Sequence, residues 1–278
     1  MNSSTIETVR TSNPVLPLER EVSEREARKV AEAAREKEWK LPSFVRELFL
    51  GRLRMDLINP LPEPKQDDGE RGEDFLRRLE DYLRTVDGDE LDRVPGMPAE
   101  VHDALSELGA FGMKIPQEFG GLGFSQRTYT RALALCGTHS ATISVTLSAH
   151  QSIGVPQPLV LFGTDEQKEK YLPRLAKGAI SGFALTETDV GSDPARMQCE
   201  AVLSDDGRTY VVNGSKLWCT NAPLAELLVV MARVPGEEGG PGGSTAFIVD
   251  MATEGVEVTN RCSFMGLPGI ENGVVQFK

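Results

Sequence analysis

The spacing of apolar residues changes at Gly178 in this chain of 278 residues, and this change limits the possible folds more than any other feature. Before Gly178, apolar residues recur every three or four positions, which is the spacing of one face of an α-helix. After Gly178 the chain reads as short strand-like runs separated by Gly, Asn and Asp. The sequence therefore predicts an α+β fold, in which an all-helical N-terminal domain precedes a mainly antiparallel β-barrel domain.

The first half contains amphipathic stretches. Residues 43–53 begin with Ser43 as a helix cap. Phe44 and Leu48 of this stretch, with Leu41 just before it, are expected to face inward. Further along, one helical stripe collects the apolar side chains Phe75, Leu76, Leu79, Tyr82 and Leu83.

Other helices are indicated by their end signals. Pro98 and Gly109 mark the two ends of one helix. Thr164, as N-cap, and Gly178 mark the ends of another. Residues 129–149 are rich in Ala, Leu, Thr and Ser and are predicted to form one long helix.

These patterns divide the chain into three segments. Residues 1–42 are a charged tail or helix, residues 43–178 form the helical domain, and residues 179–278 form the β-barrel domain. In the last segment, "SDDG" and "NGS" are typical of the tight turns that close hairpins. Such turns favour strands that pair mainly antiparallel.

The charge of the chain argues against several classes of partner. The formal net charge is −12 and the isoelectric point is near 4.9, which disfavours nonspecific binding to nucleic acid or to an anionic membrane surface. No apolar run approaches the length of a membrane span. The first ten residues show no secretory or import signal, so we expect a cytoplasmic protein.

The reactive side chains do not form a site by themselves. Four cysteines and three histidines are scattered without the spacing of a zinc or iron–sulfur site, so no metal is expected and the thiols are expected to be reduced. No Ser-His-Asp set is visible. A protein without its own reactive group can bind a cofactor and supply orientation and electrostatics.

Two segments are candidates for that binding. "FALTETDVGSD", from Phe183, starts as a strand and ends as a run of short polar residues, which suits either an ordinary turn or a ligand-binding turn. In "KLWCTN", alternation in a strand places Trp218 and Thr220 on one face and Cys219 on the other. An indole beside a hydroxyl suits a flat heteroaromatic ligand, although a half-buried sheet face would look the same.

Five stretches of the chain resemble one known family. "LSAHQSIG", "LFGTDEQKEKYLPRLAKG", "FALTETDVGSD", "YVVNGSKLWCTN" and "FMGLPGIENG" occur in the order and spacing of the acyl-CoA dehydrogenase flavoprotein family. The front half is most similar to the very-long-chain branch. The resemblance extends from Ser43 to the end of the sequence.

The resemblance implies a function, a cofactor and partners. FAD and a fatty acyl-CoA thioester would lie between the helical domain, the β-barrel domain and a third, helical domain. The implied reaction is FAD-dependent α,β-dehydrogenation to a trans-2-enoyl-CoA. An electron-transfer flavoprotein is the implied electron acceptor, and a homo-oligomer is the implied assembly.

The resemblance also implies roles for residues of this chain. The backbones of the residues at the end of the first strand would meet the edge of the flavin, and Ser192 would lie near the cofactor pyrophosphate and the CoA arm. Trp218 would pack on the flavin ring, and Thr220 would reach the reactive central nitrogen of that ring. The cofactor-binding candidates are Phe183, Leu185, Thr186, Gly191, Ser192, Trp218, Cys219 and Thr220, with Ser192 also a substrate-binding candidate.

The sequence departs from the family pattern at three places. Thr188 replaces the usual proline of the "TEPxxGSD" motif, and Pro268 stands where an arginine is common. The third domain, which carries the catalytic glutamate of the family, is not within residues 1–278, so we expect no catalytic residue in this chain and no activity of the chain alone. A non-catalytic partner subunit and an acyl-CoA oxidase are the alternative functions.

Overall fold

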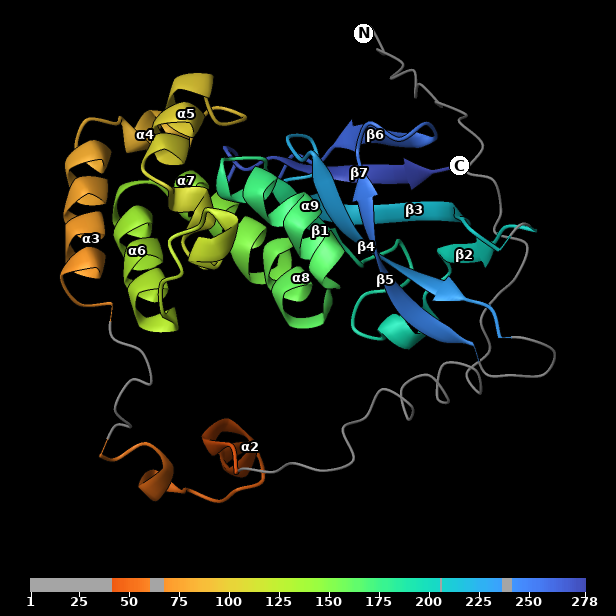
Figure 1. Ribbon diagram of the computed structural model, residues 1–278, viewed down its shortest axis with the longest axis horizontal. Coiled ribbons are helices and arrows are strands. Elements are labelled where there is room, and N and C mark those ends of the chain that lie inside the picture. Colours follow the sequence, from red (N-terminus) through yellow and green to blue (C-terminus); the bar gives the residue numbers. More distant parts are fainter. Residues whose placement is uncertain (1–41, 61–67, 206, 237–241) are drawn as a thin grey trace, which may run out of the picture.

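A computed structural model describes residues 42–60, 68–205, 207–236 and 242–278 of the chain (Figure 1). The predicted charged tail and Leu41 lie outside the described residues, apart from residue 42. The helices are α2 (Phe44–Phe49), α3 (Gly69–Leu83), α4 (Gly88–Leu91), α5 (Ala99–Glu107), α6 (Gln126–His139), α7 (Ala141–Ser148), the π-helix η4 (Ala149–Ile153), α8 (Pro156–Phe162) and α9 (Asp165–Ala176), with short 3₁₀ turns η1 (Met55–Leu57), η2 (Ala110–Gly112), η3 (Gln117–Phe119) and η5 (Pro194–Arg196). The strands are β1 (Ser181–Ala184), β2 (Glu200–Leu203), β3 (Tyr210–Thr220), β4 (Leu227–Val234), β5 (Gly243–Asp250), β6 (Val256–Arg261) and β7 (Asn272–Phe277).

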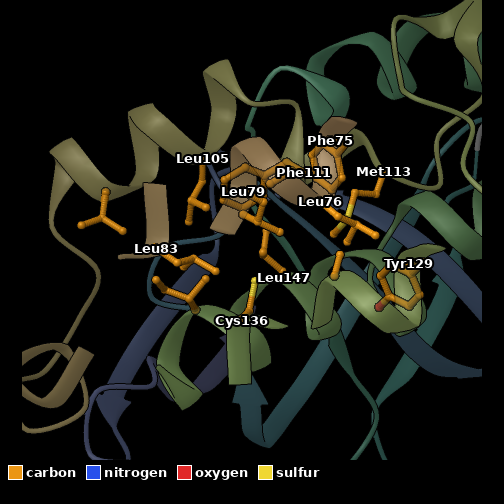
Figure 2. Close-up of a cluster of buried hydrophobic side chains, with 14 of the residues drawn as sticks. Phe75, Leu76, Leu79, Leu83, Leu105, Phe111, Met113, Tyr129, Cys136 and Leu147 are labelled. Carbon is orange, nitrogen blue, oxygen red and sulfur yellow. The ribbon is translucent and has the colours of Figure 1, made fainter. Parts of the chain in front are cut away.

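The helices gather on one side of the molecule and the strands on the other (Figure 1). The helical core lies between α3, α5, α6 and α7, and Figure 2 shows its side chains pointing toward one another. Phe75, Leu79 and Leu83 of the predicted stripe are fully buried in it. The α+β prediction is confirmed, because helices precede the strands along the chain.

The end signals of two helices act as the sequence indicates. The Thr164 hydroxyl accepts a hydrogen bond from the Gln167 N–H, and the Gln167 side-chain oxygen accepts one from the Thr164 N–H, which makes a capping box at α9. Gly109 follows α5 with φ of 80°, the left-handed conformation that glycine adopts without strain.

Two helix predictions are wrong. Residues 129–149 do not form one helix, because Ser140 is extended (φ −151°, ψ 124°) and separates α6 from α7. The break is stable because the Ser140 hydroxyl accepts from the Ile143 N–H and so caps α7. In α2, Ser43 is the cap as predicted, but the helix stops at Phe49 and Leu48 is 50% exposed, because α2 lies apart from the other helices (Figure 1).

The sheet is mainly antiparallel, as predicted, but it is mixed and not purely antiparallel. β1 pairs with β4 in parallel, and one parallel bridge joins β2 to β4 at Glu200 and Arg233. The pairs β2–β3, β3–β7, β4–β5 and β6–β7 are antiparallel. The order β1-β4-β2-β3-β7-β6, with β5 on β4, does not close into a ring among the described residues.

Strand β3 holds the two parts of this sheet together. It pairs with β2 over Tyr210–Asn213 and with β7 from Gly214 onward. Gly214 lies where the partner changes, with φ of 147°, and a Cβ there would lie 2.8 Å from Cys199 atoms. A glycine is therefore required at this corner.

Buried polar contacts join the helices to the sheet. His150 of η4 contacts Ser181 of β1, and the amide of Asn221 donates to the carbonyls of Thr146 (3.0 Å) and Ser181 (3.1 Å). Over the described ranges, no helix is both long enough and apolar enough to cross a membrane.

Candidate functional site

The two candidate segments lie side by side in the structure. The Leu217 N–H donates to the Thr186 carbonyl at 2.8 Å. Gly182 of β1 approaches β3 so closely that a Cβ would lie 2.5 Å from the Thr220 carbonyl oxygen. The ladder between β1 and β4 ends at the pair Ala184–Val230, so Leu185 and Thr186 lie beyond the regular strand.

Trp218 leaves the regular strand geometry. Its φ is 57°, and the register between β3 and β7 shifts between Lys216 and Cys219. Strict alternation would put Lys216 on the same face as Trp218. The Trp218 side chain is instead 58% exposed, whereas Lys216 is fully buried, because the irregularity turns the indole outward.

Lys216 ties β3 to the segment that follows β1. Its Nζ donates to the Leu185 carbonyl at 3.0 Å and to Oε1 of Glu187 at 2.7 Å. The Glu187 carboxylate also accepts from the N–H groups of Gln198 (2.7 Å) and Cys199 (2.9 Å). This buried ion pair therefore has hydrogen-bond partners on both sides, as buried charges require.

Thr220 lies two positions after Trp218, at the end of β3. Its side chain is half-buried, and Oγ1 accepts a hydrogen bond of 2.9 Å from Nδ2 of Asn272. The same Asn272 nitrogen lies 3.3 Å from the Trp218 carbonyl oxygen. Asn272 itself is buried, with 5% exposure.

The other cofactor-binding candidates differ in how exposed they are. Phe183 and Leu185 are half-buried, and Gly191 and Ser192 are exposed in the turn after β1. The Cys219 side chain is buried in the sheet core, where burial raises the pKa of its thiol to about 12, so only its backbone can meet a ligand.

Glu187, Lys216 and Asn272 are not among the residues that the sequence indicates as functional. All three lie inside stretches that resemble the family, and for Glu187 and Lys216 their charge within such a stretch is the only sequence signal. The ion pair between Glu187 and Lys216 could not be derived from the sequence, because strict alternation places the Lys216 side chain on the same face of the strand as the exposed Trp218. Asn272 is 52 positions from Thr220, and only the β3–β7 register brings the two together.

The candidate site is separate from the cavity between the sheet strands. A cavity of about 560 Å³ lies elsewhere, between Tyr210, Phe247 and Val256, and neither Trp218 nor Thr220 lines it. Within the described ranges, no group of three or more His, Cys, Asp or Glu side chains is placed to hold a metal ion. Two carboxylates on the site segments are ion-paired: Glu187 with Lys216, and Glu271 with Arg261 at 2.9 Å.

Comparison with protein families matches both halves of the chain. Residues 73–179 match the N-terminal domain of acyl-CoA dehydrogenases, and residues 182–278 match the middle domain. The chain belongs to the acyl-CoA dehydrogenase family. The division at residues 178 and 179 stays a prediction.

Curated relatives of this family member come from bacteria and mammals. The "Probable acyl-CoA dehydrogenase FadE10" of Mycobacterium tuberculosis is 53% identical over 256 residues, which is 92% of this chain and 39% of that protein. The mitochondrial very long-chain specific acyl-CoA dehydrogenase of Homo sapiens is 38% identical over 77% of this chain and 34% of its own length. The chain thus spans about two fifths or less of the length of these relatives.

Solved structures share the fold. The butyryl-CoA dehydrogenase of Megasphaera elsdenii is 30% identical with a TM-score of 0.68, over 77% of this chain and 57% of that one. An acyl-CoA dehydrogenase from Bacillus anthracis, complexed with FAD, is 29% identical with a TM-score of 0.64, over 78% of this chain and 37% of that one.

Proposed function

We propose that this member of the acyl-CoA dehydrogenase family forms the FAD- and substrate-binding part of an enzyme that converts a fatty acyl-CoA into a trans-2-enoyl-CoA. One observation carries the proposal. Trp218, whose indole is exposed, and Thr220 lie in the stretch of β3 that contacts the end of β1, and we take these segments together as one cofactor surface.

The residues on this surface fit a flavin. An exposed indole supplies flat apolar area, and a hydroxyl supplies a directed hydrogen bond. The backbone of Leu185 and Thr186, beyond the last ladder pair of β1, can meet the polar edge of the ring. We assign Gly191 and Ser192 to the pyrophosphate and the CoA arm, because they lie exposed in the following turn.

Bound FAD would accept a hydride from the substrate. The residues of this chain would bind and orient the ring and the thioester. We assign no base to this chain, because Glu187 and Glu271 are engaged in ion pairs. An electron-transfer flavoprotein as acceptor, a homo-oligomer and a cytoplasmic location remain predictions.

The direct test is a titration of this chain with FAD. Trp39→Phe leaves Trp218 as the only indole, so quenching of its emission reports ring stacking. We expect binding weaker than nanomolar, and a loss of affinity of about fivefold or more in Trp218→Ala, since aromatic stacking contributes about 1 kcal/mol beyond area burial. The proposal fails if FAD does not bind, or if Trp218→Ala binds it equally well.

The catalytic assignment has its own test. The FAD-loaded chain is mixed anaerobically with saturated acyl-CoA thioesters of different lengths, and flavin absorbance is followed. We expect no bleaching by the chain alone. Bleaching together with enoyl-CoA formation would show that this chain carries a base.

A further inference from the structure

We propose that Asn272 is a positioning residue that directs the hydroxyl proton of Thr220 toward a flavin bound beside Trp218. This inference rests on the proposed function, because it concerns the same cofactor surface. It gives a role to a residue of β7 that is not among the cofactor-binding candidates of the sequence.

The amide orientation of Asn272 is set by its two neighbours. Asn272 is the first residue of β7 and pairs directly with Thr220 in the ladder. Nδ2 donates to Thr220 Oγ1 at 2.9 Å and lies 3.3 Å from the Trp218 carbonyl oxygen. A carbonyl can only accept, so the nitrogen must be the atom that faces this pair.

That contact determines where the hydroxyl proton can point. A hydroxyl group has one proton to donate and two lone pairs. The Asn272 amide occupies a lone pair, so it cannot receive the Thr220 proton at the same time. Within the described part of the chain, the Thr220 hydroxyl donates no hydrogen bond, so its proton is available to a ligand.

The contact also strengthens the hydroxyl as a donor. Hydrogen bonds in a chain polarise one another, so an oxygen that accepts from an amide donates more strongly. Asn272 is 5% exposed, and water therefore competes little for this amide. A stronger donor favours the more negatively charged reduced flavin over the oxidised form.

The experiment compares the affinities of this chain for oxidised FAD and for FAD reduced with dithionite. The measured quantity is the ratio of the oxidised to the reduced dissociation constant. Thr220→Val removes the donor and should lower the ratio about fivefold, while Thr220→Ser should keep it near the wild-type value. Asn272→Ala should lower the ratio about two- to threefold, because the hydroxyl loses its orienting amide.

The decisive measurement is the double variant. If Asn272 acts through the hydroxyl, Asn272→Ala should leave the ratio unchanged in the Thr220→Val background. Asn272→Asp keeps the shape but accepts the Thr220 proton, so it should lower the ratio at least as far as Thr220→Val does. Comparing Asn272→Asp in both backgrounds separates this effect from that of its added charge, and it decides the question if Asn272→Ala does not fold.

The outcomes separate the two proposals. If the wild-type chain binds neither form of FAD, the proposed function fails. If FAD binds but Asn272→Asp leaves the ratio unchanged, or Asn272→Ala lowers it equally in both backgrounds, Asn272 does not orient the hydroxyl and this inference is overturned.

Discussion

Lys216 carries a positive charge at a fully buried position, and two groups compensate for the loss of its hydration. Its ammonium group has Glu187 and the Leu185 carbonyl, at 2.7 and 3.0 Å. Moving a charge out of water is costly, so a buried ion pair contributes little to net stability. Removing one partner is strongly destabilising, because the remaining charge stays buried without compensation. The pair therefore holds the end of β1 against β3 as long as both members are present.

Lys216→Met should lower the free energy of unfolding by about 3–5 kcal/mol, because it leaves the Glu187 carboxylate buried without its counter-charge. The double variant Lys216→Met, Glu187→Gln should lose less than the single variant, since no unpaired charge remains. Urea unfolding measures both. Arg77→Met, at the exposed pair with Asp74, is the matched control and should change stability by less than about 1 kcal/mol. A double variant less stable than Lys216→Met would contradict the argument.

At the scale of elements, Asp92 holds the start of α7. Its carboxylate accepts from the Ser140 hydroxyl (2.7 Å) and from the N–H groups of Ala141 and Thr142 (both 2.9 Å). Burial opposes the ionised form, but these hydrogen bonds prevail and keep the pKa of Asp92 below its usual value. The break between α6 and α7 is thus supported from α4.

Asp92→Ala should lower the free energy of unfolding by about 2–3 kcal/mol, because the free N–H groups of α7 lose a charged acceptor. Asp89→Ala is the control, since the Asp89 side chain is 89% exposed and lies 3.9 Å from Arg93. That control should cost less than about 1 kcal/mol. Chemical denaturation near neutral pH compares the three proteins, and equal losses in both variants would exclude the capping role.

The contact between β1 and β3 depends on the size of residue 182. Gly182→Ala should push the strands apart, because its Cβ would lie 2.5 Å from the Thr220 carbonyl oxygen. We expect a loss of about 1–3 kcal/mol in unfolding free energy and a weaker affinity for FAD. Gly243→Ala is the control, since no atom lies within 4 Å of the added Cβ. Unchanged FAD affinity in Gly182→Ala would show that this spacing does not shape the site.

The elements that the sequence predicted best are those with local signals. Thr164 and Gln167 are three positions apart, and their capping box is visible in the sequence. The break at Ser140 was missed because its stabilising partner, Asp92, lies 48 positions away. The same holds for the candidate site. Trp218 and Thr220 were predicted because they lie in one local motif. The positive φ of Trp218 was not predicted, because it accompanies a register shift against β7, which is distant in sequence.

At the scale of the whole molecule, His150 joins the helices to the sheet without a charge. Its Nδ1 accepts from the Ser181 N–H at 3.1 Å, so the proton is on Nε2, which donates to the Phe111 carbonyl at 3.1 Å. Burial lowers the pKa of His150 to about 4. These partners lie 31 and 39 positions away, so the sequence could not show that this histidine joins the two parts.

The free energy of unfolding should therefore decrease as the pH is lowered from 6.5 to 4. His150 takes up its proton near pH 6.5 when unfolded and near pH 4 when folded, so the unfolded state binds more protons between these values. Its contribution is complete above pH 6.5 and is lost as the pH falls toward 4, by about 3 kcal/mol in total. Unfolding free energies of the wild type and His150→Asn at pH 7 and 4.5 measure this. The variant should lose less stability than the wild type on acidification, and an equal loss would contradict the assignment.

The two pairings of strand β3 limit where residues can be inserted into the chain or deleted from it. One ladder pairs its first residues with β2, and another pairs its last residues with β7, across the corner at Gly214. A single residue inserted within Tyr210–Thr220 would turn the side chains on one side of the insertion to the opposite face. Natural insertions and deletions should therefore be excluded from β3 and tolerated in the hairpin turn before it, where Ser204 and Thr209 close a loop at the surface.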